Sequence, residues 1–169
     1  MLHLFNSLAR MDTQALMEIY AESNCENAED MFPDLESSAG ILRVESEFLD
    51  YLRRDFFSQP GAVYALWRQD GIDVSALRLE PYKSGYLLEA LETRPDSRNR
   101  GYACDLIRAV QQLPQYDCLY SHVSRRNLPS MTVHQKSGFN IILDHAVYLD
   151  GSINTRSCTL QWVKEKTDR

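Results

Sequence analysis

The spacing of apolar residues in the first sixty positions predicts a short strand followed by two helices. Residues 2–8 are read as the strand. The first helix, which Asp12 or Thr13 can cap, has apolar residues at one-face spacing: Ala15, Leu16, Ile19 and Tyr20. The second helix is marked in the same way: Phe48, Leu49, Leu52 and Phe56. The acidic segment between them, residues 25–40, contains Pro33 and is predicted to be a loop.

After Gln59-Pro60-Gly61 the period changes from helical to strand-like. Residues 62–68 and 72–79 read as two strands of a hairpin that turns at Asp70-Gly71, and residues 86–93 as a third strand. Residues 98–113 are predicted to be a helix, with one apolar face: Ala103, Leu106, Ile107, Val110 and Leu113.

The pattern in the last third of the chain predicts three more strands and one helix. Residues 117–123 read as a strand, and residues 129–137 as a short helix that Gly138 stops. Residues 139–149 and 155–163 are expected to form a last hairpin over Asp150-Gly151. Hairpins followed by one strand–helix–strand crossover favour a mixed α/β sheet with helices on both faces. The length fits one domain, residues 1–169.

Composition narrows the class of protein. The chain is 44% hydrophobic and 25% charged, as is typical of a globular protein, and no apolar run is long enough to cross a bilayer. Without a signal-peptide pattern at residues 1–10, the cytoplasm is the expected compartment. Because the net charge is −6, nucleic acid is not an expected partner. The charge is uneven: residues 1–60 carry 4 basic and 12 acidic side chains, a net of −8.

The four cysteines are scattered and form no CxxC pair, so neither a metal site nor a disulfide framework is expected from them. The candidate chemistry lies elsewhere, at the junction of residues 93–103. A strand ends at Thr93, because Pro95 cannot continue a regular ladder, and a helix begins shortly after Gly101. Such a junction points free backbone N–H groups and the positive end of a helix dipole at one spot.

That spot suits a diphosphate. Gly101 and Ala103 are small enough for phosphate oxygens to approach the backbone, and Arg98 and Arg100 add positive charge. The chain has neither the GxxxxGK[ST] of a P-loop nor the GxGxxG of a Rossmann dinucleotide site. Many strand–turn–helix junctions bind no ligand, so the junction alone leaves both readings open.

Two motifs bear a resemblance to a known family. Arg98-Asn99-Arg100-Gly101-Tyr102-Ala103 is similar to the Q/R-x-x-G-x-G/A signature of the GNAT N-acetyltransferases, and Thr93-x-Pro95 resembles the V-x-P before it. Residues 127–139, NLPSMTVHQKSGF, resemble the family's N-x-x-S-x-x-x-Y-x-K-x-G-F. The motifs stand in the family's order, with matching strands and helices between them.

The resemblance implies a largely antiparallel sheet of about seven strands, splayed between the fourth and fifth, with acetyl-CoA as cosubstrate. The pantetheine arm would pair with the splayed strand, the diphosphate would rest on the loop amides, and Asn127 would contact the arm. The implied cofactor-binding residues are Leu91, Glu92, Thr93, Arg98, Asn99, Arg100, Gly101, Tyr102, Ala103, Cys104 and Asn127.

The resemblance also points to candidates for the general acid and the general base. His134 replaces the tyrosine that usually acts as the general acid, and an imidazole can donate a proton near neutral pH. The alternative is that His134 only fills the tyrosine's place. His122 is the preferred candidate for the general base. Glu89, Glu92 or a water relay without a dedicated base are alternatives.

The expected activity is acetyl transfer to a primary amine of a small molecule or a peptide. The acidic segment would steer a cationic acceptor through its carboxylates: Glu26, Glu29, Asp30, Asp34 and Glu36. They could equally be a solvated loop. A non-catalytic acetyl-CoA-binding domain, or a transferase for another acyl-CoA, remains open, and the pattern does not decide between a monomer and a homodimer.

Overall fold

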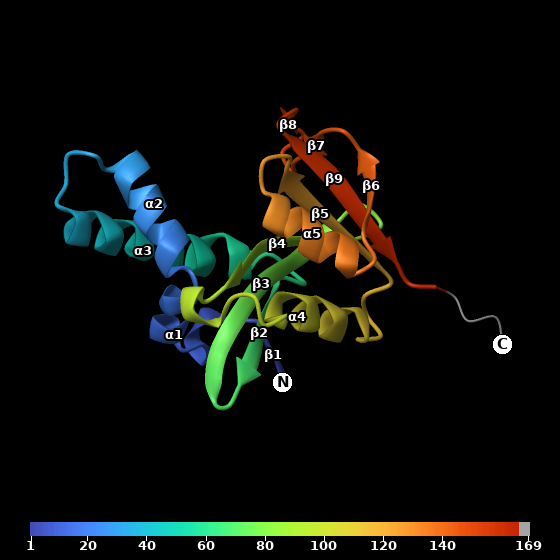
Figure 1. The fold of residues 1–169 in the computed structure, drawn as a ribbon, viewed down its shortest axis with the longest axis horizontal. Coiled ribbons are helices and arrows are strands. Elements are labelled where there is room, and N and C mark those ends of the chain that lie inside the picture. Colours follow the sequence, from blue (N-terminus) through green and yellow to red (C-terminus); the bar gives the residue numbers. More distant parts are fainter. Residues whose placement is uncertain (166–169) are drawn as a thin grey trace.

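A computed structural model describes residues 1–165 of the chain. Its main sheet has seven strands in the order β1-β2-β3-β4-β5-β9-β6, shown in Figure 1. In this spatial order the strands are β1 (Leu2–Phe5), β2 (Val63–Gln69), β3 (Ile72–Tyr82), β4 (Gly85–Thr93), β5 (Cys118–Ser124), β9 (Ser157–Val163) and β6 (Asn140–Leu143). Within this sheet only β4 and β5 run parallel.

The described residues also form five α-helices and three short 3₁₀ turns. The helices are α1 (Thr13–Ile19), α2 (Ala21–Met31), α3 (Ser37–Arg54), α4 (Tyr102–Gln111) and α5 (Leu128–Lys136). The 3₁₀ turns are Leu8–Arg10, Phe56–Ser58 and Pro95–Ser97. The predicted mixed α/β sheet of about seven strands, mostly antiparallel, is confirmed.

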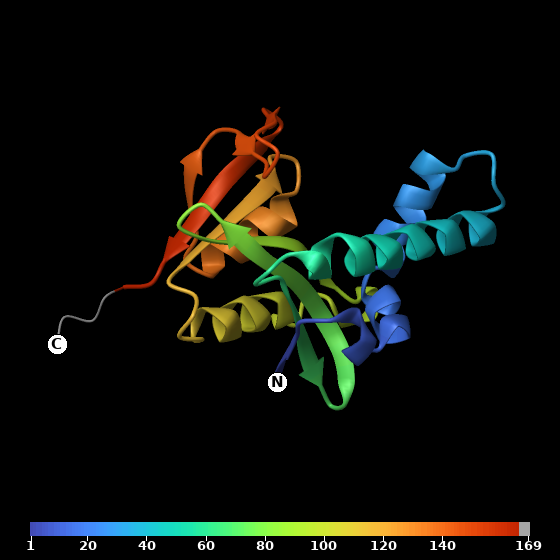
Figure 2. The ribbon, with the colours of Figure 1, turned by 180° about the vertical axis from the view of Figure 1, so that it is seen from behind.

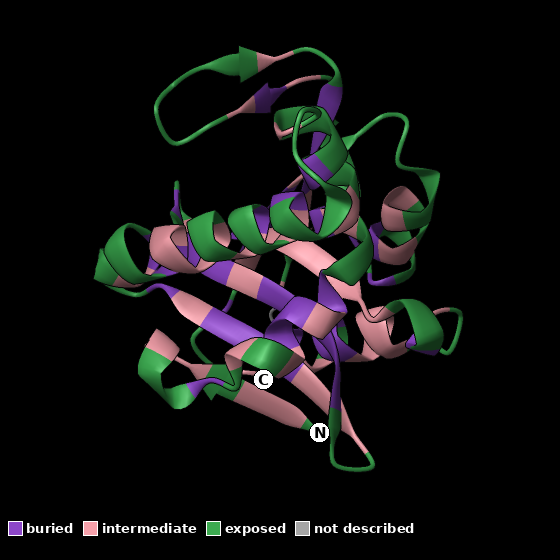
Figure 3. Cartoon of the chain, turned by 90° about the vertical axis from the view of Figure 1, so that its left-hand side faces the viewer, coloured by how far each residue is buried: buried purple, intermediate pink, exposed green. Residues whose placement is uncertain are grey.

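Alternation along the strands divides the core between the two faces of the sheet. On β2, Ala65 points to the cluster formed with α4, whereas Tyr64 and Leu66 point to the cluster formed with α1 and α3. Figure 3 shows the corresponding bands of buried residues along the strands and the exposed outer sides of the helices. Helices therefore cover both faces, as the sequence predicted.

The predicted loop at residues 25–40 is wrong. Helix α2 occupies residues 21–31, and α3 begins at Ser37, so only residues 32–36 connect them. Glutamate and alanine are strong helix formers, and Pro33 ends α2 because the residue before a proline is disfavoured in the helical region. Gly40 lets α3 approach closely, since a Cβ there would lie 3.3 Å from the Ala28 Cβ. Figures 1 and 2 show α2 and α3 projecting together from one side of the sheet.

The turn at Asp70-Gly71 is confirmed, and both residues have the positive φ of a tight hairpin turn. The last hairpin is only partly as predicted. β6 pairs directly with β9, while the turn at Asp150-Gly151 closes a separate two-stranded sheet, β7 (Ala146–Val147) with β8 (Ile153–Asn154). The expected strand 139–149 is interrupted where the Asp144 carboxylate bonds the His145 ring and the Thr159 hydroxyl bonds the His145 carbonyl.

Candidate functional site

A bulge in β4 shapes the edge of the site. Between Ala76 and Arg78 the partners on β4 jump from Glu92 to Glu89, so β4 carries one extra residue at Ala90 and Leu91. Ala90 takes a positive φ of 50°. The Tyr20 hydroxyl donates to the Ala90 carbonyl (2.6 Å), and the Tyr64 hydroxyl lies 2.7 Å from that of Tyr20. A buried tyrosine pair thus stabilises the bulge.

β4 and β5 separate directly beside the bulge. Their parallel pairing covers Tyr86↔Leu119, Leu87↔Tyr120 and Leu88↔Ser121, and then stops, whereas β5 stays paired with β9 as far as Ser124. The Arg94 N–H donates to Val74 on β3. By strand alternation, the backbone groups of Leu91 and Thr93 therefore face the opening instead. The expected splay between the fourth and fifth strands is confirmed.

The loop after β4 borders this opening and begins α4. Asn99 and Gly101 both have left-handed φ values, 61° and 87°, which turn successive backbone N–H groups to one side. A Cβ built on Gly101 would meet no heavy atom within 4 Å. Gly101 is therefore needed for its backbone conformation, and the space beside it is open to a ligand.

A cleft of about 630 Å³ runs between this loop, the splayed end of β4 and the start of α5. Ten of the predicted cofactor-binding residues line it: Leu91, Glu92, Thr93, Arg98, Asn99, Gly101, Tyr102, Ala103, Cys104 and Asn127. Arg100 is exposed and is not part of the lining. The cleft has a glycine turn with free space beside it and a strand edge without a partner strand, so it fits an extended ligand that carries phosphates.

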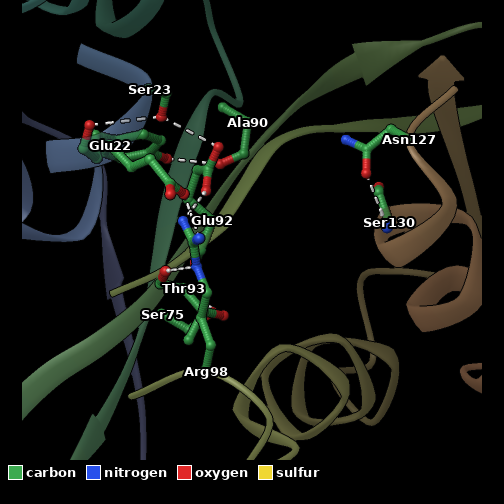
Figure 4. A network of polar contacts seen from close by, with 10 residues as sticks. Glu22, Ser23, Ser75, Ala90, Glu92, Thr93, Arg98, Asn127 and Ser130 are labelled. Carbon is green, nitrogen blue, oxygen red and sulfur yellow. Dashed lines mark hydrogen bonds and ion pairs between the residues drawn. The ribbon is translucent and has the colours of Figure 1, made fainter. Parts of the chain in front are cut away.

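The Arg98 guanidinium, expected to add positive charge for a phosphate, is held by the protein's own acceptors. It forms an ion pair with Glu22 of α2, lies 3.9 Å from the Glu92 carboxylate, and donates from Nε to the Thr93 carbonyl (3.2 Å). The Ser23 hydroxyl donates to Glu92 (3.2 Å). Burial raises the pKa of Glu92, although Ser23 and Arg98 oppose that shift. Figure 4 shows this network on one side of the cleft.

Asn127 lies on the opposite side. Its side-chain oxygen caps α5 by accepting from the Ser130 N–H (3.0 Å). Figure 4 shows its amide nitrogen pointing away from Ser130 toward the space facing β4, where it can donate to a ligand.

His134 lies in the core behind the cleft wall. It is 1% exposed and packs edge-on against Phe139, with ring centroids 5.2 Å apart. Its Nδ1 is 2.8 Å from the Ser130 carbonyl, which can only accept, so Nδ1 carries the proton. Burial lowers the pKa of His134, which keeps Nε2 unprotonated. His134 is not among the cleft-lining residues. The acid role stays a prediction that this position does not favour.

His122 lies where the two strands part. Continuing the β4·β5 register by one step places it opposite Glu89, on the face away from α4. Neither ring nitrogen has a hydrogen-bond partner among the described residues, and the ring packs edge-on against Tyr82 and Tyr148. Burial lowers the pKa of His122, so the ring is neutral and able to accept a proton at neutral pH.

Sequence reasoning missed three residues that shape the site. Tyr20 supports the bulge, Glu22 lines the cleft from α2, and Ser23 bonds the Glu92 carboxylate. All three lie at the junction of α1 and α2 or in the first turn of α2, which the fold brings beside the end of β4. Residues 1–165 hold no group of three or more His, Cys, Asp or Glu side chains placed to bind a metal ion. None of the helices in the same range is long and apolar enough to cross a membrane.

Comparison with solved structures finds the same fold. PaiA N-acetyltransferase from Thermoplasma acidophilum, solved with coenzyme A, is 13% identical with a TM-score of 0.64, over 96% of this chain and 99% of that one. The ribosomal-protein-S18-alanine N-acetyltransferase of Escherichia coli is 15% identical with a TM-score of 0.58, over 100% and 97%. PH1933 from Pyrococcus horikoshii OT3 is 12% identical with a TM-score of 0.65, over 98% and 99%. No curated protein sequence matches significantly.

A family model decides the classification. The model described as "Acetyltransferase (GNAT) family" matches residues 14–139, which is well over half of the chain. The match includes the bulged strand, the glycine turn and α5, which Asn127 caps. The chain therefore belongs to the acetyltransferase (GNAT) family.

Proposed function

We propose that this protein transfers the acetyl group of acetyl-CoA to a primary amine of a small molecule or a peptide. The observation that carries the proposal is the interrupted ladder between β4 and β5, which ends at Leu88↔Ser121 beside a loop with an open-sided Gly101. One ligand that needs both a strand edge and a phosphate cradle is an acyl-CoA, because its pantetheine amides can pair with a strand.

In this proposal the backbone of Leu91 and Thr93 pairs with the pantetheine arm, while the amides of residues 99–104 hold the diphosphate. Asn127 donates its side-chain amide to the arm from across the cleft. The likeness to a coenzyme A complex from T. acidophilum agrees with this use of the fold.

The acetyl transfer needs a donor for the negative charge that develops on the carbonyl oxygen and an acceptor for a proton. The amine nitrogen bonds to the thioester carbonyl carbon while the carbon–sulfur bond breaks, and the sulfur leaves with the electron pair as coenzyme A thiolate. The Leu91 N–H, which the bulge turns toward the opening, donates to the carbonyl oxygen as it gains negative charge. His122 accepts the proton that the nitrogen loses, and Glu89 opposite it favours the resulting imidazolium.

The proposal is tested by incubating the purified protein with acetyl-CoA and a panel of polyamines, aminoglycosides, amino acids and peptides, and measuring free thiol. We expect thiol release with at least one amine and none without an acceptor. A failure to bind coenzyme A in titration calorimetry would refute the proposal. Competition between acyl-CoAs of increasing chain length tests the preference for acetyl.

A non-catalytic acetyl-CoA-binding domain is the second candidate. The observation in its favour is the buried His134 at the position of the usual tyrosine acid. Such a domain would be stabilised by acetyl-CoA against heat but would release no thiol with any acceptor. Thiol release above the acceptor-free rate excludes this candidate.

A further inference from the structure

The Arg98 guanidinium is bound by acceptors of the protein itself. It lies in the wall of the cleft, beside the loop whose amides face the open side of Gly101. Its Nη1 pairs with Glu22, its Nη2 approaches Glu92, and its Nε bonds the Thr93 carbonyl. A phosphate entering the cleft therefore meets an arginine that is already neutralised.

The charges around Arg98 favour the pairing of its guanidinium with Glu22 and Glu92. Two carboxylates, Glu22 and Glu92, face one guanidinium, so the three groups together carry a net charge of −1 when all are ionised. Glu22 itself lines the cleft, and its side chain comes from the first turn of α2, not from the cofactor loop. A carboxylate at this position repels an incoming diphosphate in addition to holding the arginine.

We propose that Glu22 is a built-in competitor of the cofactor: its carboxylate occupies Arg98 until the diphosphate of an acyl-CoA takes its place. When Arg98 turns to the diphosphate, the Thr93 carbonyl also loses its side-chain donor. That carbonyl faces the splay, where it becomes available to an amide of the pantetheine arm. Glu22 therefore sets the affinity for the cofactor, and it links α2 to the filling of the cleft. This inference rests on the proposed function.

The test is the affinity for coenzyme A, measured by titration calorimetry on the whole protein and on the Glu22→Gln variant. Removing the competing charge is expected to tighten binding about threefold to fivefold, the range of a partly exposed ion pair. The matched control is Glu29→Gln, which makes the same charge change at an exposed residue about two turns further along α2, outside the cleft lining. Its affinity is expected to equal that of the parent protein.

Two further measurements separate competition for Arg98 from a general charge effect. In an Arg98→Gln background, the increase in coenzyme A affinity from Glu22→Gln is expected to shrink markedly. In about 1 M salt the same increase is expected to fall, because screening weakens the Glu22–Arg98 ion pair. Equal affinity of the parent and Glu22→Gln, weaker binding, or an undiminished gain without Arg98 overturns the inference. A parent protein that binds no coenzyme A refutes the proposed function instead. Glu22→Asp, which keeps the charge on a shorter side chain, serves as a second variant if Glu22→Gln does not fold.

Discussion

Gly101 combines a left-handed backbone with free space on the side where a side chain would stand. Most residues resist this conformation, and at Gly101 any side chain would also project beside the loop amides. The same pair of properties occurs at Gly151, in the turn between β7 and β8. The two glycines therefore allow the backbone effect and the ligand effect to be measured separately.

Gly101→Glu is expected to abolish coenzyme A binding, because it places bulk and a negative charge where the diphosphate would lie. Gly151→Glu carries the same backbone strain of about 1 kcal/mol and is expected to bind coenzyme A normally. Titration calorimetry of both variants decides the matter, and equal affinities would remove the diphosphate site from this loop.

His122→Gln is expected to lower turnover about tenfold to a hundredfold, since glutamine cannot accept the proton of the amine. Its affinity for coenzyme A is expected to stay close to that of the parent, because His122 lies outside the cleft lining. Initial rates with an acceptor from the panel measure the effect. Unchanged turnover would shift the base role to Glu89 or to water.

His134→Ala is expected to lower the free energy of unfolding by about 2–3 kcal/mol, as for other large side chains removed from a core. Its buried ring contacts Phe139 and bonds the Ser130 carbonyl, so the variant loses both packing and a hydrogen bond. Urea denaturation measures the loss. A variant of normal stability with much slower thiol release would instead support the acid role of His134.

β4 and β5 lie close together at the start of β4 and separate toward its end. At the tight end, a Cβ on Gly85 would lie 2.2 Å from the Cys118 carbonyl oxygen, so the two strands approach more closely there than any other residue permits. At the open end, the bulge at Ala90 and the loss of pairing after Leu88 turn β4 away from β5. The width of the cleft thus depends on backbone contacts at both ends of β4.

Gly85→Ala is expected to destabilise the fold by about 1–3 kcal/mol, because the clash is with backbone atoms that cannot swing aside. Gly85 lies at the other end of β4 from the loop around Gly101. Weakened coenzyme A binding in the folded variant would therefore mean that the separation of β4 and β5 has changed. Denaturation midpoints and calorimetry together report both effects. Parent-like stability would contradict the close approach of the two strands.

Charge is distributed unevenly over the molecule as a whole. The acidic first sixty residues include α1 to α3, and Figure 1 shows α2 and α3 projecting from one side of the sheet. By strand alternation, Glu80, Glu89 and His122 lie on the face of the sheet away from α4. Glu80 is 3% exposed, and its surroundings include Glu89, Arg78 and Tyr51. Burial, and next the charge of Glu89, raise the pKa of Glu80 to about 7 against the pull of Arg78.

Glu80 is expected to make the protein less stable as the pH rises. A glutamate in the unfolded chain titrates near about 4.3, so between that pH and about 7 the folded state binds the extra proton. The stability that this proton provides is complete below that range and is lost as the pH approaches 7. Glu80→Gln should therefore raise the melting temperature more at pH 8 than at pH 5. A larger gain at pH 5 would contradict the sign of the shift.

The sequence by itself determined most of the elements and the loop around Gly101, because local pattern is enough for both. Alternation predicted β2, β3 and the turn at Asp70-Gly71. The resemblance of the two motifs to the GNAT family implied ten of the residues that line one cleft. It failed at α2, where acidic composition was taken for a loop although glutamate and alanine favour a helix.

Only the tertiary structure decided how the elements cooperate. Tyr20 supports the bulge at Ala90, Glu22 pairs with Arg98, and Glu89 lies opposite His122. In each case the two residues are about thirty to eighty positions apart in the chain. Periodicity reports which side of an element is apolar, but it carries no information on which other element lies there. The contacts of Tyr20 and Ser23 with β4, and the point at which β4 and β5 part, supply that information.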